Sequence, residues 1–238
     1  MHFVQFTLNP PAAVVAAAFG SFSAGRAQEV VVARQGGALE LLRPDEATGR
    51  LATVASTATF SCVRALCAVR PTGAATDDVA VASDAGTLTV LRFDAARGAW
   101  TRIHCETFGK TGCRRAVPGQ YLAADPRGRA VMVAAVARTK LVYPRNRDAA
   151  GAPTISSPLE AHKARCVVFD VVALDVGFDN PCFAALELDY GDADVDASGE
   201  AARIPTGMSQ QCSTEYVRTV GAVSYTHLRA HETVLDLV

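Results

Sequence analysis

The chain has 238 residues, half of them apolar, and a formal net charge of −1. These values are typical of a globular protein with one large or two small domains, and they exclude a uniformly basic nucleic-acid-binding protein. No apolar run approaches the roughly 20 residues that a membrane-spanning helix needs. The charge is nevertheless uneven, because residues 102–147 hold ten Lys or Arg against two acids, whereas residues 166–202 hold nine acids and no Lys or Arg.

The first predicted element is the apolar run Ala12–Ala24. A secretory signal would need basic residues before such a run, but no Lys or Arg precedes it, so the sequence favours a buried first strand. The chain also contains seven cysteines, an odd number with no C-x-x-C pair. This pattern is typical of reduced thiols in an intracellular protein.

An internal repeat follows, because residues 28–51 align with residues 77–100 without a gap at an offset of 49, with ten identical positions. Each copy predicts a β-branched strand, a Gly-containing tight turn, an alternating strand, a polar turn that ends in Gly, and a third strand. Two fainter copies occupy residues 129–145 and 181–192, so the first strands of the four copies are expected to start near residues 30, 79, 131 and 182.

An antiparallel unit that repeats every 40 to 50 residues is typical of a β-propeller, in which one blade cannot bury both of its faces alone. The sequence therefore predicts an all-β fold, a partial WD40-like β-propeller of about four four-stranded antiparallel blades. Closure normally takes more blades, up to about eight. We expect the four blades not to form a closed ring.

The stretch at residues 106–115, ETFGKTGCRR, contains the letters GKT of a phosphate-binding loop. The first glycine of that motif is replaced by His104, and Pro118 and Gly119 would break the helix that must follow it. We therefore expect no binding of ATP or GTP and no cofactor.

Two other patterns imitate metal sites. His227 and His231 stand at i, i+4 without the Glu of an HExxH motif, and the run from Asp192 to Asp196 lacks the Gly and Glu that a calcium loop needs at its sixth and twelfth positions. No arrangement typical of a serine hydrolase is present either. The sequence predicts no metal site and no catalytic residues.

Several runs closely resemble one family. EVVVAR, LELLRPD, IHCETFGKTGCRRAVPGQ and KLVYPRNRDAAGAPTISSPLEAHKA resemble the N-terminal propeller of the large β-propeller subunits of splicing factor 3b, and the resemblance extends from about Phe3 to Ala202. The wider superfamily includes the damaged-DNA-binding ubiquitin-ligase adaptor and the large cleavage-and-polyadenylation subunit. The resemblance makes the run Phe108–Gln120 a connection between blades.

The resemblance implies a non-enzymatic scaffold of three propellers and a small helical C-terminal part. It would work in the nucleus within the U2 small nuclear ribonucleoprotein, in branch-site recognition during pre-mRNA splicing. Its partners would be other splicing factor 3b subunits, including the helical-repeat subunit, with at most weak or indirect RNA contact, no membrane and no small-molecule substrate. The alternative is a propeller adaptor of a cullin ubiquitin ligase or a cleavage and polyadenylation subunit.

The sequence departs from the family in two places. Pro144 and Arg145 stand where the family has an apolar pair, and a proline there would remove a donor from the ladder. After about Arg203 the resemblance ends. We therefore assign residues 1–203 to the first propeller and expect residues 204–238 to be a divergent tail, a product of gene-model or assembly error, with no strand that could cap the last blade.

The basic segment supplies the candidate contact residues. They could neutralise RNA phosphates, or they could pair with acidic partner helices and with the chain's own acidic blade. Only Phe108 and Tyr121 could stack on bases there, which favours protein contact over RNA. The candidates are Lys110, Arg114, Arg115, Arg127 and Arg129.

Overall fold

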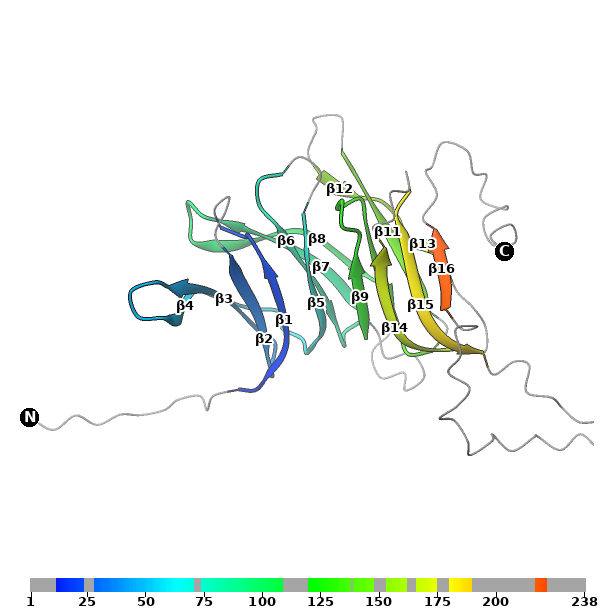
Figure 1. The fold of residues 1–238 in the computed structure, drawn as a ribbon, viewed down its shortest axis with the longest axis horizontal. Coiled ribbons are helices and arrows are strands. Elements are labelled where there is room, and N and C mark those ends of the chain that lie inside the picture. Colours follow the sequence, from blue (N-terminus) through cyan, green and yellow to red (C-terminus); the bar gives the residue numbers. More distant parts are fainter. Residues whose placement is uncertain are drawn as a thin grey trace, which may run out of the picture.

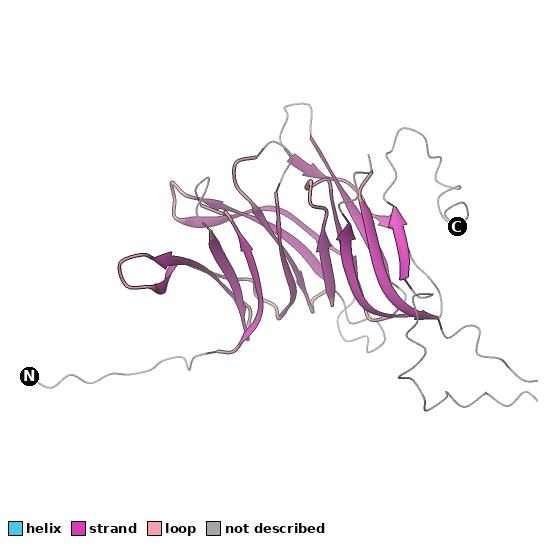
Figure 2. Ribbon diagram, viewed as in Figure 1, coloured by secondary structure: helices cyan, strands magenta, loops and turns pink. Residues whose placement is uncertain are grey.

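The computed structural model describes residues 12–23, 28–70, 74–108, 120–137, 139–147, 153–161, 166–174, 180–189 and 217–221. Within these ranges all regular structure is β-strand, as Figure 2 shows. The described residues accordingly include no helix that could cross a membrane.

The strands form four antiparallel sheets, which stand side by side in chain order (Figure 1). The first and second blades run in simple order β1-β2-β3-β4 and β5-β6-β7-β8. Their strands are β1 (Val14–Gly20), β2 (Glu29–Arg34), β3 (Ala38–Asp45), β4 (Arg50–Ala58), β5 (Val63–Val69), β6 (Asp78–Ser83), β7 (Thr87–Asp94) and β8 (Ala99–Thr107).

The third blade has the order β9-β10-β11-β12, with β13 also paired to β11, and the fourth has the order β14-β15-β16. Their strands are β9 (Tyr121–Ala124), β10 (Ala130–Ala134), β11 (Lys140–Arg147), β12 (Pro153–Ile155), β13 (Leu159–Glu160), β14 (Cys166–Leu174), β15 (Cys182–Asp189) and β16 (Val217–Gly221). The predicted all-β, unclosed partial propeller is thus confirmed. The repeat is confirmed as well, since β2, β6, β10 and β15 begin within one residue of the expected starts.

The tight turn between the second and third strands of a blade requires glycine. Gly37 has a φ of +84° and Gly86 a φ of +76°, both in the left-handed region that favours glycine. A Cβ atom on Gly37 would lie 2.2 Å from the carbonyl oxygen of Ser61, so the chain also approaches too closely there for any other residue. The glycine that recurs at an offset of 49 in the sequence therefore fixes the same turn in two blades.

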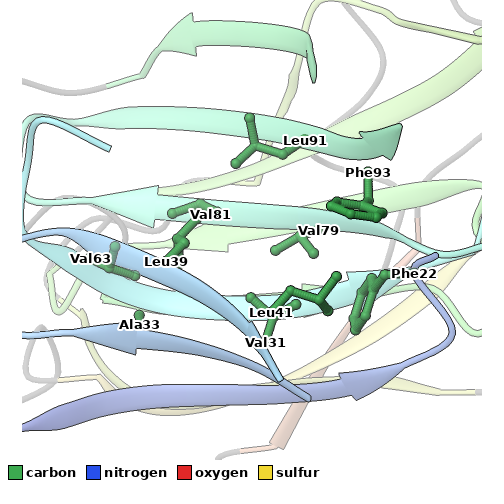
Figure 3. Close-up of a cluster of buried hydrophobic side chains, with 10 residues drawn as sticks. All are labelled: Phe22, Val31, Ala33, Leu39, Leu41, Val63, Val79, Val81, Leu91 and Phe93. Atoms are coloured by element: carbon green, nitrogen blue, oxygen red, sulfur yellow. The ribbon is translucent and has the colours of Figure 1, made fainter. Parts of the chain in front are cut away.

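In the part of the chain that the structure describes, three apolar clusters form the core, each between two successive blades. Successive side chains of a strand point to opposite faces, so β6 contacts both neighbouring blades: Val79 and Val81 face the first blade, and Ala80 faces the third. Figure 3 shows the cluster between the first two blades, where Phe22, Leu39 and Leu41 lie against residues of the second. The stability of each blade therefore depends on its neighbours.

Pro144 lies inside β11, opposite Ala130. Its carbonyl accepts a hydrogen bond from the backbone N–H of Ser156, at 2.9 Å, so the side of Pro144 that lacks a donor faces the break between β12 and β13. The predicted loss of a ladder donor thus coincides with the point where the outer strand is interrupted, and the pairing with β10 is kept.

The expectation that the tail contributes no strand is wrong. β16 lies within residues 204–238 and pairs antiparallel with β15, from Cys182 opposite Gly221 to Leu186 opposite Val217. The physical reason is that VRTVG combines three β-branched residues with a free edge on β15, which offers unpaired backbone groups to any nearby strand. Only five residues are needed for this pairing, too few for an alternating pattern to stand out.

Candidate interaction surface

Two of the five candidate residues, Arg127 and Arg129, belong to the tight turn between β9 and β10. The turn is closed by Asp125, whose carboxylate accepts hydrogen bonds from the backbone N–H groups of Arg127 and Arg129, each at 3.1 Å. Gly128 has a φ of +69° and donates its N–H to the carbonyl of Asp125 at 2.7 Å. The run D-P-R-G-R therefore forms this turn for local reasons, independently of any ligand.

The charge of Arg129 is already used within the turn. Its guanidinium donates Nε and Nη2 hydrogen bonds, each 2.9 Å long, to the two oxygens of Asp125, a bidentate pair. Burial by itself would raise the pKa of Asp125, but the hydrogen bonds and charge of Arg129 outweigh it and hold the pKa below its ordinary value. Asp125 is therefore ionised at neutral pH. Arg127, in contrast, is exposed.

The other three candidates, Lys110, Arg114 and Arg115, lie outside the described residues. The strands that flank them place their attachment points: β8 ends at Thr107, and β9 begins at Tyr121. Because β9 runs from Tyr121 to Ala124 and only then enters the turn of Arg127, these attachment points lie at the opposite end of the third blade. Of the five candidates, the structure therefore describes only Arg127 and Arg129, and a contact surface made of all five stays a prediction.

Two further cations of the basic segment are buried and connect blades. Lys140 of β11 pairs with Glu187 of β15, and both side chains are buried between the third and fourth blades. Arg145 of β11 is only 5% exposed and donates Nη2 to Oδ2 of Asp78 in the second blade, at 3.0 Å. Part of the positive charge between residues 102 and 147 therefore stabilises the stack of blades, including one pair with the acidic fourth blade.

Asp78 belongs to a repeated pair that sequence reasoning missed. In the second blade Arg92 donates Nε to Asp78 at 2.8 Å, and in the first blade Arg43 donates Nε to Glu29 at 2.9 Å. Both acids and both arginines are separated by the repeat offset of 49. The signal was present in the aligned copies, since Arg43 and Arg92 are identical and the residues at 29 and 78 are both acidic.

The third blade departs from this pair. Arg129 occupies the position of the acid, because it lies opposite Arg145 and its carbonyl accepts the N–H of Arg145 at 2.7 Å. Two arginines cannot pair, so Arg129 turns to Asp125 of its own turn and Arg145 reaches Asp78 of the preceding blade. An exchange of charge at one repeat position thus creates a contact between blades.

The described residues contain no group of three His, Cys, Asp or Glu side chains that could hold a metal ion. His227, His231 and the acidic run from Asp192 to Asp196 lie outside them. Lys110, the lysine of the GKT stretch, does too.

Several known proteins are similar in sequence to this chain. Splicing factor 3B subunit 3 of Drosophila melanogaster is 50% identical over 221 residues, which cover 93% of this chain and 18% of that protein. Spliceosome-associated protein 130 A of Arabidopsis thaliana is 48% identical over 202 residues, 85% of this chain and 16% of that protein. Pre-mRNA-splicing factor RSE1 of Mycosarcoma maydis is 48% identical over 201 residues, which cover 84% of this chain and 16% of that protein.

The chain spans less than a fifth of the length of these relatives. A family model described as the RSE1/DDB1/CPSF1 first beta-propeller matches residues 13–232. The match runs past residue 203, and the boundary of a divergent tail at that position stays a prediction. The resemblance to splicing factor 3b subunits is confirmed, and the chain belongs to the RSE1/DDB1/CPSF1 first beta-propeller family.

Proposed function

We propose that this chain is part of the first propeller of a splicing factor 3b scaffold subunit, which acts without catalysis in pre-mRNA splicing. The observation that carries the proposal is the identity of about 50% over 93% of the chain to splicing factor 3B subunit 3. The protein would work in the nucleus, in the U2 small nuclear ribonucleoprotein, and would contact other splicing factor 3b subunits, including the helical-repeat subunit.

The described architecture supports a scaffold role. The ion pairs with the most deeply buried carboxylates, those of Glu29, Asp78, Asp125 and Glu187, all join strands, turns or blades of the chain itself. Their chemistry stabilises the stack of blades. Rigid blades with exposed turns suit the arrangement of several partner proteins around one body.

We further propose that the basic candidates contact acidic protein surfaces in preference to RNA. Arg129 is committed to Asp125, which places a carboxylate within the turn that also presents Arg127. The negative charge of Asp125 lowers the attraction of this turn for phosphates. Lys110, Arg114 and Arg115 remain candidate protein contacts, and only their positive charge supports them.

The test is affinity purification of the complete gene product from its own cells, followed by mass spectrometry. We expect splicing factor 3b and U2 proteins to be recovered in stable ratios. Recovery of a cullin, or of cleavage and polyadenylation factors, without U2 components would refute the proposed function.

A second experiment repeats the purification with the variants Arg127→Glu and Lys110→Glu and measures both the proteins and the RNA that are recovered. Loss of a protein partner without loss of RNA would support the protein role, and the reverse would contradict it.

A further inference from the structure

The outer edge of β4 is unpaired in the described part of the chain. β4 is the last strand of the first blade, in the order β1-β2-β3-β4, and no described segment pairs with its other side (Figure 1). Seven of its nine residues are exposed, including Leu51 and Val54. Such an edge presents backbone N–H and C=O groups that can pair with another extended chain.

The register shows which backbone groups of β4 lie on this edge. The N–H of Thr59 donates to the carbonyl of Gly37, at 2.7 Å, so the backbone groups of Thr59 face β3. In an antiparallel pair these groups alternate between the two sides of the strand, and the second half of β4 pairs with β3 without a shift. Ser56 and Ala58 therefore direct their N–H and C=O groups to the outer edge. Both side chains are small, so a neighbouring strand can approach closely.

The outer edges of the next two blades are protected against such pairing, whereas β4 is not. Natural proteins protect strand edges with charges, prolines and breaks. The edge strand β8 has a bulge at the same repeat position as β4, but it carries three ionisable side chains, Arg102, His104 and Glu106. The outer edge of the third blade is broken into β12, which begins at Pro153, and β13, which follows Pro158. Residues 51–63 contain neither a charged residue nor a proline.

We propose that β4 binds an extended, uncharged segment of another protein, which pairs with Ser56 and Ala58 as a fifth strand of the first blade. The inference rests on the proposed function in one respect, namely that the chain works through protein contacts. Only another polypeptide backbone repeats N–H and C=O groups at the spacing of a strand, so nucleic acid does not fit this edge, whatever charges the neighbouring loops carry. A charged segment fits poorly, because residues 51–63 offer no counter-charge to a side chain that loses its water.

A short segment is sufficient for this pairing. Within the chain itself, the five residues of β16 pair with the edge of β15. β4 is ordered before anything binds, because it pairs with β3 and because the N–H and hydroxyl of Thr59 both donate to the carbonyl of Gly37. Binding therefore orders only the incoming segment. A second copy of the chain fits less well, because its β4 belongs to a four-stranded blade and cannot adjust its twist to the edge as a separate segment can.

Hydrogen exchange resolved to single amides tests the pairing. The full-length gene product is purified from its own cells with its partners and again after high salt has removed them. We expect the amides of Ser56 and Ala58 to exchange at least about tenfold more slowly in the complex, because they gain hydrogen bonds. The amide of Thr57, which faces β3, should change little. The outward amides of Cys105 and Thr107, at the same repeat positions of β8, are the control and should not change.

Proline substitution blocks the added strand while the blade stays intact. Ser56→Pro removes an N–H that faces the outer edge, so the pairing of β4 with β3 is kept. Its matched control is Cys105→Pro, 49 residues further along, where the N–H of β8 also faces outward. Mass spectrometry of the affinity-purified variants should show one protein partner reduced at least about tenfold by Ser56→Pro and unchanged by Cys105→Pro. Ser56→Lys keeps every backbone group and adds a charge, and it should reduce the same partner.

Unchanged exchange at Ser56 and Ala58, or full recovery of every protein partner in both Ser56 variants, would overturn the inference. Slow exchange of these amides in the protein without its partners would overturn it too, because the chain itself or a second copy would then cover the edge. Loss of RNA instead of a protein would do the same. If splicing factor 3b components co-purify in these cases, the proposed function still stands. If the lost partner belongs to no splicing complex and no splicing factor 3b component is recovered, the proposed function fails while the added strand remains.

Discussion

Asp78 is the carboxylate on which two blades depend. It is fully buried and accepts hydrogen bonds from Arg92 of its own blade and from Arg145 of the next. We expect Asp78→Ala to lower the free energy of unfolding by about 3–5 kcal/mol, because it leaves the buried Arg145 without its carboxylate. Urea titration followed by the fluorescence of Trp100, the single tryptophan, measures this loss.

The control for this prediction is Glu40→Ala, which breaks the partly exposed pair with Arg34. A pair of this kind contributes at most about 1 kcal/mol. Equal effects of the two variants would mean that the contact between Arg145 and Asp78 adds nothing to the stack of blades.

Glu29 makes stability depend on pH in the acidic range. Burial alone would raise its pKa, but hydrogen bonds from Ser23 and Arg43 outweigh burial and hold the pKa below the ordinary value of 4.5. The unfolded chain therefore binds the proton more readily, so this stabilisation is complete above pH 4.5 and is lost as the pH falls through the lower pKa of the folded state. We expect the urea midpoint to fall between pH 5 and pH 3, and to fall less in Glu29→Gln. An identical decline in that variant would contradict the assignment.

Among the strands, β11 contains the least expected residue, Pro144. The side of Pro144 that lacks an N–H faces the break between β12 and β13, where no strand needs that donor. We therefore expect Pro144→Val to change the free energy of unfolding by less than about 1 kcal/mol. Thr89→Pro, in the middle of β7 between two paired strands, should cause a clearly larger loss. Circular dichroism during urea titration compares the two. A large gain in Pro144→Val would show that the proline strains β11.

The sequence predicted the strands of the repeat well, because Gly37 and Gly86 fix identical turns and the β-branched runs of β2 and β6 differ little. It predicted the candidate surface poorly. From the sequence, Lys140 and Arg145 only add to the positive charge of their segment. Their ion pairs could not be predicted, because no pattern in a single sequence shows which cation pairs with an acid about 50 residues or more away.

At the scale of the whole molecule, the uncovered face of the first blade determines whether the protein associates in solution. Val14, Val15 and Phe19 of β1 are between 50% and 72% exposed, on a blade with no neighbour before it among the described residues. We expect residues 1–238 to associate or aggregate and to unfold broadly, because uncovered faces and free strand edges promote association. Size-exclusion chromatography with calorimetry tests this.

A variant with Val15→Lys and Phe19→Lys provides the control for association, since it adds charge to the same strand without touching the clusters between blades. It should elute closer to the monomer volume than the wild type. A wild-type chain that is monodisperse and unfolds in one sharp transition would show that four blades suffice for a stable body.

The order of the apolar clusters also has a consequence for synthesis on the ribosome. Each cluster joins blades that are adjacent in the sequence, so the first is complete once Phe93 and Trp100 have been translated. Translation proceeds at about 5–20 residues per second, so a repeat of about 50 residues emerges every 3–10 seconds or so. The nascent chain can therefore add one blade at a time onto a finished surface. We expect this order of synthesis to disfavour pairing errors between distant blades, because the correct neighbour is always made first.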